Sequence, residues 1–166
     1  MLFPLLTNQS SGGVAAAIEV DEEKENCGRY GYCWPRDAVF ITKAYDKLKM
    51  QKETEKFYKN FCKNTQNKNG MWEQRFYTDG RLAPCWGYQI DETASVIFGV
   101  YNHYKVFEDV KFLKDNLKMC EKALNFLQIP FFHHHKNVKV CIFLFLDLIS
   151  QVLPFLYLHF PVLLCF

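Results

Sequence analysis

The sequence predicts an all-α fold built from antiparallel helical hairpins. Apolar residues recur every three to four positions in four stretches between residues 34 and 127, which is the period of an amphipathic helix. The connections between these stretches are alternately short and long, and no two stretches show the alternating pattern of paired strands. Because a short connection joins antiparallel neighbours, the four stretches are expected to form two hairpins.

The first long helix is expected to begin at Trp34-Pro35-Arg36-Asp37 and to extend to about Met50. Proline suits a first helical turn, and the carboxylate of Asp37 complements the positive end of the helix dipole. A second helix is expected from about Lys52 to Thr65, after almost no loop. Upstream, Leu2 to Leu6 is a short apolar run that fits the remnant of a helix.

A long aromatic segment, residues 71–90, separates the two hairpins. It lacks helical periodicity, has a turn at Asp79-Gly80, and contains Pro84, which stops a helix. The next helix starts at Asp91-Glu92-Thr93, and a last helix follows a break at Glu108-Asp109. Since the long loops fall at the same end of each hairpin, the two helix starts are expected to lie on one face together with the aromatic segment.

The length of the chain limits it to one domain at most. It has 166 residues, of which 49% are hydrophobic and 17% aromatic, and a formal net charge of +2. No basic stripe is available to follow a phosphate backbone, so no nucleic-acid partner is expected. Seven Cys without a Cys-x-x-Cys pair favour reduced, mostly buried thiols over a disulfide framework. The amino-terminal run lacks the basic region of a secretory signal, which favours a cytoplasmic location.

Both helix starts combine charged groups with aromatic rings. The first holds Tyr32, Trp34, Arg36 and Asp37, and the second holds Trp86, Gln89, Asp91 and Glu92. Aromatic rings pack on the C–H faces of a sugar, while arginine and carboxylates form directional hydrogen bonds with vicinal hydroxyls. The mixture therefore suits a carbohydrate. The alternative is a structural role, because acidic residues at helix starts are common caps.

Four runs of the sequence form an ordered set. They are Gly12-Gly13-Val14-Ala15-Ala16, residues 30–38 (YGYCWPRDA), residues 70–80 (GMWEQRFYTDG) and residues 83–95 (APCWGYQIDETAS). In order and spacing they resemble the start of the catalytic domain of glycoside hydrolase family 15, the family of glucoamylases, glucodextranases and microbial trehalases. The likeness is greatest to the bacterial and archaeal glucoamylase-like branch. It implies that residues 1–130 are the N-terminal part of a toroid of six helical hairpins, an (α/α)6 barrel that remains incomplete here.

The resemblance implies an exo-acting hydrolase that releases glucose from the non-reducing ends of α-glucans with inversion. Arg36 and Asp37 match the pair that holds the hydroxyls of the terminal sugar in the innermost subsite. Trp34 matches the aromatic residue beside them. The expected partner is thus a starch-type α-glucan or α-glucoside, with no cofactor, while glucodextranase and trehalase specificity stay open.

The second helix start supplies the other residues that the resemblance assigns to substrate binding. Trp86 matches the loop tryptophan that lines the pocket near the scissile bond. Gln89 and Asp91 match polar residues that order the pocket wall behind it. Tyr32 and Glu92 are expected to support these residues from behind, and Glu92 is more consistent with a helix cap than with a direct ligand contact.

The carboxyl pair needed for catalysis is not found in the sequence. An inverting glycosidase uses a general acid and a general base roughly 6.5–9.5 Å apart. In the family, the acid lies in an Asp-Leu-Trp-Glu-Glu-like motif after the helix that would follow Leu127, and the base lies far downstream; neither motif occurs here. We therefore expect no catalytic residue in this chain, and whether it acts as an enzyme stays open. The alternative is a non-catalytic carbohydrate-binding or membrane-associated interaction fragment.

Residues 131–166 form a hydrophobic tail that does not resemble the family. The tail holds 24 apolar residues among 36 and only 3 charged ones. The length of residues 140–166 permits a membrane span, but Asp147 and two prolines interrupt it. A non-native tail, from a frameshift or read-through, is favoured over membrane contact and over a packed extension. Three consecutive histidines, 133–135, do not converge on one face, so no metal site is expected.

Overall fold

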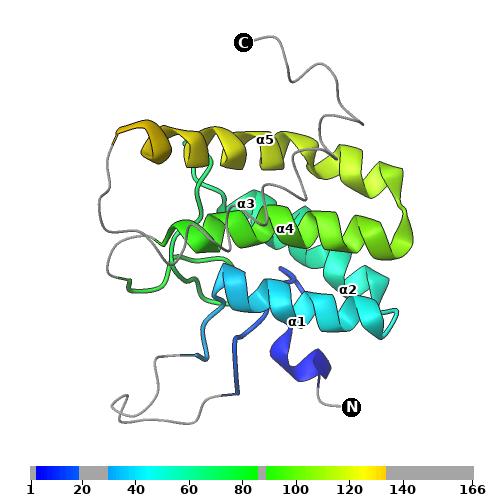
Figure 1. Ribbon diagram of the computed structural model, residues 1–166. Coiled ribbons are helices and arrows are strands. Elements are labelled where there is room, and N and C mark those ends of the chain that lie inside the picture. Colours follow the sequence, from blue (N-terminus) through cyan, green and yellow to red (C-terminus); the bar gives the residue numbers. More distant parts are fainter. Residues whose placement is uncertain (1–2, 19–29, 86–88, 134–166) are drawn as a thin grey trace.

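The computed structural model describes residues 3–18, 30–85 and 89–133, and this part of the chain is mainly helical (Figure 1). Its elements are the 3-10 turn η1 (Phe3–Leu6), α1 (Pro35–Lys47), α2 (Gln51–Lys56), the π-helix η2 (Phe57–Cys62), α3 (Lys63–Thr65), α4 (Ile90–Phe107) and α5 (Val110–His133). Among the described residues, β-type pairing is limited to isolated bridges. The predicted all-α class is confirmed.

Two antiparallel hairpins lie side by side. In Figure 1, α1 and α4 run in the same direction, whereas α2 to α3 and α5 run in the opposite direction. Helix α4 packs against both α1 and α5, and α1 packs against α2. The turns 48–50 and 108–109 are short, while the connection from α3 to α4 covers residues 66–89. The predicted alternation of short and long connections is thus confirmed, and it places the starts of α1 and α4 at the same end.

Helix α1 ends at Lys47, earlier than the predicted end near Met50. The residue that stops it is Lys49, whose φ of 60° lies in the left-handed region. The backbone N–H of Met50 then bonds to the carbonyl of Tyr45, which closes a tight turn into α2. The spacing of the apolar residues does not indicate that the helix ends here, because Leu48 continues the apolar pattern for one more position.

The second predicted helix is continuous from Gln51 to Thr65, but its middle is wound as a π-helix. Over Phe57–Cys62, four of six side chains are buried: Phe57, Tyr58, Phe61 and Cys62. The wider π turn brings more consecutive side chains onto one face than a regular turn does. This segment therefore fills the space between the two hairpins with aromatic rings.

Trp72 ties the long connection to both hairpins. Its ring is fully buried, and its indole N–H donates to the carbonyl of Cys62 at 3.0 Å. Its backbone N–H donates to Oγ1 of Thr93 in α4 at 3.1 Å. Close helix packing is also needed at Gly99, because a Cβ there would overlap the hydroxyl of Tyr58. The two hydrogen bonds of Trp72 fix how the segment of residues 71–85 sits on the helices.

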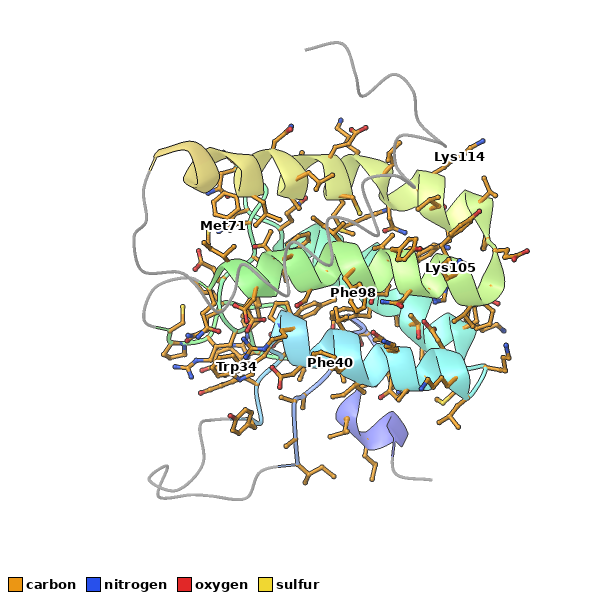
Figure 2. All side chains as sticks on the ribbon, viewed as in Figure 1. Trp34, Phe40, Met71, Phe98, Lys105 and Lys114 are labelled. Atoms are coloured by element: carbon orange, nitrogen blue, oxygen red, sulfur yellow. The ribbon has the colours of Figure 1, made fainter. Side chains whose placement is uncertain are left out.

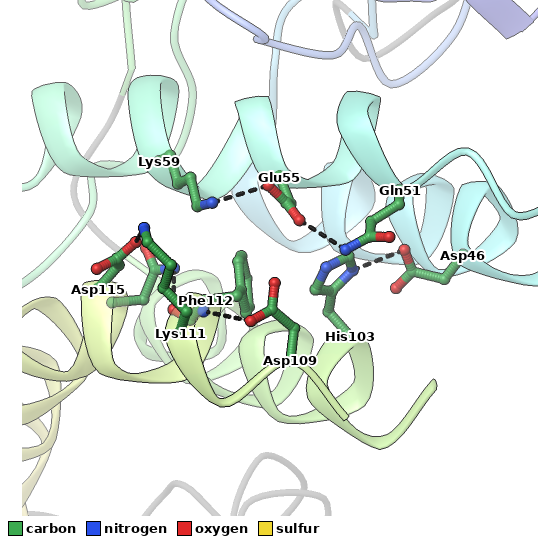
Figure 3. A network of polar contacts seen from close by, with 10 residues as sticks. Asp46, Gln51, Glu55, Lys59, His103, Asp109, Lys111, Phe112 and Asp115 are labelled. Carbon is green, nitrogen blue, oxygen red and sulfur yellow. Dashed lines mark hydrogen bonds and ion pairs between the residues drawn. The ribbon is translucent and has the colours of Figure 1, made fainter. Parts of the chain in front are cut away.

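A buried polar pair joins α1 to α4 at the end opposite their starts (Figure 3). Nδ1 of His103 lies 2.8 Å from Oδ1 of Asp46, and neither side chain is more than 3% exposed. The imidazole also packs against the rings of Phe112 and Phe107, at 4.3 and 4.9 Å between centroids. The pair fixes the register of α1 against α4, and hence the register of their starts.

The last helix continues past the predicted domain boundary at residue 130, because α5 reaches His133. Residues 134–166 lie outside the described part, so the boundary and the membrane contact through residues 140–166 remain predictions. No helix within residues 3–18, 30–85 and 89–133 is long and apolar enough to cross a membrane. The cysteines described there, Cys33, Cys62, Cys85 and Cys120, are free thiols, and all except Cys85 are buried.

Candidate functional site

The starts of α1 and α4 meet at one end of the molecule. Figure 2 shows Trp34, which precedes α1, and Met71 at this end, while Lys105 and Lys114 lie at the opposite end. Neither Trp34 nor Gln89, the residues that precede the two helices, caps its own helix with its side chain. Two positive helix ends therefore lie together without local caps, which favours carboxylates at this position.

Arg36 is the centre of a polar cluster that joins the two helix starts. Its Nη1 donates to Oε1 of Gln89 at 3.2 Å and to Oδ2 of Asp91 at 2.5 Å, and its Nη2 lies 3.5 Å from Oδ2 of Asp37. The side chains of Arg36, Asp37 and Asp91 are 31%, 31% and 37% exposed. The predicted meeting of the two helix starts is confirmed. The cluster is open to solvent on its outer side.

Glu92 closes the inner side of this cluster and is fully buried. Its Oε2 accepts the backbone N–H of Arg36 at 2.7 Å, so a residue of α4 caps the first turn of α1. Its Oε1 lies 3.4 Å from Nη2 of Arg36. Burial, together with the nearby carboxylates of Asp91 and Asp37, raises the pKa of Glu92 to about 8 against the opposing effect of the Arg36 N–H and guanidinium.

The aromatic side of the site is largely occupied by protein. Trp34 is 9% exposed, and the guanidinium of Arg75 lies 5.2 Å from its ring centroid. The same guanidinium lies 5.7 Å from the ring of Tyr32, and its Nε donates to the carbonyl of Pro84 at 2.6 Å. The ring of Trp34 is thus largely covered by protein, and the roles of Trp34 and Tyr32 at the site stay predictions. Trp86 lies outside the described residues.

The segment before α1 holds the aromatic connection against the site. Cys33 and Phe76 exchange two backbone hydrogen bonds of 2.8 Å each. The ring of Tyr32 also contacts that of Tyr77 edge to face, at 5.2 Å between centroids. The predicted position of the aromatic connection beside the two helix starts is therefore confirmed.

Arg75 is a structural element of the site that the sequence analysis did not single out. It is only 2% exposed although arginine is almost always a surface residue. A signal was available in the sequence, because Arg75 is the one cation within the aromatic run from Trp72 to Tyr77. A cation between aromatic residues is a common arrangement for packing over a ring face.

The cluster suits a neutral ligand rich in hydroxyl groups. The carboxylates of Asp37 and Asp91 already engage the guanidinium of Arg36, so little of its positive charge is left for an anion such as phosphate. Arg36, Asp37, Gln89 and Asp91 present partly exposed hydrogen-bond donors and acceptors next to one another. Such an arrangement can bind two neighbouring hydroxyl groups of a ligand. Within the described ranges, no group of three His, Cys, Asp or Glu residues is arranged to hold a metal ion.

Comparison with known proteins identifies one relative of note. Over 125 residues the chain is 28% identical to a protein of Methanocaldococcus jannaschii named as an uncharacterized glycosyl hydrolase. The alignment covers 75% of this chain but 19% of the relative, so the chain spans about a fifth of that protein's length. No model of a protein family matches the chain. No solved structure matches it either.

Proposed function

We propose that this chain is part of the catalytic domain of a glycoside hydrolase and that the Arg36 cluster binds a terminal sugar residue. The observation that carries the proposal is the contact of Arg36 with Asp91, Gln89 and Asp37 at the meeting of two helix starts. The similarity to a protein named as a glycosyl hydrolase supports the class.

The finer proposal is a glucoamylase-like enzyme of glycoside hydrolase family 15 that acts on α-glucosidic bonds of starch-type oligosaccharides and polysaccharides. The four ordered sequence runs support it. The parallel helices α1 and α4, each with an antiparallel partner, are compatible with two repeats of a larger helical toroid (Figure 1). In this proposal, Arg36 and Asp37 hold the hydroxyls of the innermost glucose, and Gln89 and Asp91 order the wall behind it together with Trp86.

Hydrolysis is proposed to need carboxyl groups from segments that the sequence of this chain does not contain. Inversion requires a general acid and a general base, with a water molecule held between the base and the sugar. Asp37, Asp91 and Glu92 all engage the same guanidinium, which suits binding and orientation of a sugar. The absence of the expected acid and base motifs favours a second candidate, a carbohydrate-binding fragment without turnover.

The test is a binding and turnover assay on the 166-residue chain with maltose, maltotriose, isomaltose and trehalose. We expect binding of maltose without release of glucose, and a loss of affinity of about tenfold or more in Arg36→Lys, because lysine cannot form the forked contacts of a guanidinium. Arg81→Lys is the matched control, since Arg81 forms an exposed ion pair with Asp79 outside the cluster. Equal affinities in the wild type and Arg36→Lys would refute the sugar site. Glucose release lost in Asp37→Ala would instead show that the chain is an active enzyme.

A further inference from the structure

One carboxyl group contacts Arg36 at two separate places. Oε2 of Glu92 accepts the backbone N–H of Arg36, and Oε1 faces Nη2 of the guanidinium at 3.4 Å. Gln89, Asp91 and Asp37 contact the guanidinium. Glu92 thus couples the position of the first turn of α1 to the direction of the Arg36 side chain.

We propose that Glu92 is a positioning residue, which orients Arg36 for sugar binding through the charge of its buried carboxylate. This role rests on the proposed function of the cluster. Glu92 is fully buried, so it acts on the ligand through Arg36. A guanidinium that is already fixed between Glu92 and Asp91 loses less freedom when a sugar binds, and this preorganisation increases affinity.

Capping of α1 does not by itself account for a carboxylate at this position. A neutral acceptor such as an amide oxygen would satisfy the backbone N–H of Arg36 equally well. Burying a charged group without full compensation costs free energy, and among residues 3–18, 30–85 and 89–133 no group forms a hydrogen bond with Oε1 of Glu92. The carboxylate of Glu92 also attracts Nη2 of Arg36, whereas a neutral amide oxygen at the same place would attract it only weakly.

The positioning is expected to depend on pH. The groups that face Glu92 are Arg36 and Asp37 on α1, Asp91 at the start of α4, and the thiol of Cys33 before α1. Burial raises the pKa of Cys33 far above neutrality, so this thiol stays uncharged. Since burial raises the pKa of Glu92 to about 8, the charged form that holds Arg36 becomes dominant only above that pH. Sugar affinity is therefore expected to increase between pH 6 and pH 9.

The experiment compares the 166-residue wild type with Glu92→Gln and with Glu55→Gln as a matched control. Glu55 is a partly buried carboxylate on α2 that binds Lys59 and Gln51 away from the cluster (Figure 3). Maltose affinity at pH 6 and pH 9 and the NMR signals of the backbone amide and side chain of Arg36 are the readouts. We expect Glu92→Gln to remain folded, to bind maltose about tenfold more weakly than the wild type at pH 9, and to lose the pH dependence.

The readouts separate this inference from the proposed function. If Glu92→Gln matches the wild type in affinity and in the Arg36 signals at pH 9, the positioning role is wrong while the sugar site stands. If the wild type binds no sugar but its Arg36 side-chain signal changes between pH 6 and pH 9, the proposed function is wrong while the positioning stands. If Glu92→Gln does not fold, the test rests on the wild type alone. An Arg36 side-chain signal that stays the same between pH 6 and pH 9 then shows that Glu92 does not position Arg36.

Discussion

Glu92 is expected to make the protein less stable as the pH rises. Its pKa increases from an ordinary 4.5 to about 8 on folding, because burial disfavours the charged form. Between these values the folded state keeps a proton that the unfolded chain releases, so the stability that Glu92 contributes is fully present below pH 4.5 and is lost as the pH rises through this interval. At about 1.4 kcal/mol for each tenfold change in proton affinity, the loss is on the order of 5 kcal/mol. That is comparable to the total stability of about 5–15 kcal/mol of an ordinary domain.

Urea unfolding at pH 5 and pH 9 measures this loss directly. The variant Glu92→Gln resembles the protonated carboxyl, so its stability is expected to stay nearly constant over this range. At pH 9 the variant is then more stable than the wild type by several kcal/mol. Glu55→Gln serves again as the control, because its partly buried carboxylate on α2 forms an ion pair of about 1 kcal/mol or less.

Parallel pH dependence in the wild type and in Glu92→Gln would refute this reasoning. It would mean that the contacts of Arg36 compensate the burial of the charge in full. The expected result also bears on function, because the charged form of Glu92 that destabilises the fold is the form proposed to orient Arg36. A variant that gains stability and loses sugar affinity at high pH is the signature of that trade-off.

Three single substitutions in the core, two of them combined with a second change, test the packing that supports the site. Gly99→Ala is expected to destabilise by about 1–3 kcal/mol, although alanine ordinarily favours a helix, because the new Cβ overlaps the Tyr58 hydroxyl. Adding Tyr58→Phe is expected to recover part of that loss in urea unfolding, and strictly additive losses would contradict the contact. Trp72→Ala is expected to lower stability by about 3–5 kcal/mol, since its ring is fully buried, and a loss below about 1 kcal/mol would rule out its bridging role. His103→Ala leaves the buried carboxylate of Asp46 without this partner and is expected to cost about 3 kcal/mol in thermal unfolding, with a smaller further cost on adding Asp46→Asn.

The parts of the structure that follow from local patterns could be predicted from the sequence. Helix periodicity placed α1 and α4, and the start of α5, within a few residues of their bounds, because each helix buries an apolar stripe on one side. The meeting of Arg36 with Asp91 followed from topology, since alternating loop lengths force two helix starts to one end. The substrate roles of these residues, and of Trp86, stay predictions.

Features that depend on how the helices are rotated against one another could not be predicted. Asp91 and Glu92 are adjacent acids in a first turn, and the sequence alone does not indicate that one faces solvent while the other caps α1. The π turn of η2 could not be predicted either, because its aromatic residues fit a regular helix equally well. The burial of Arg75 reverses the usual preference of arginine for the surface, and it depends on the rings of Trp34 and Tyr32 being brought to it.

The cap that Glu92 provides to α1 spans 56 positions of the chain, and this spacing determines the order in which the site assembles. Helices α1 to α3 are neighbours in sequence and lose little chain entropy on pairing, whereas the Arg36 amide finds its acceptor only after the second hairpin has docked. The rate at which this amide exchanges its hydrogen with solvent therefore measures docking of the two hairpins, separately from the formation of either one. A folding intermediate that contains only the first hairpin presents Arg36 without its acceptor, so the proposed sugar site is complete only once the second hairpin has docked.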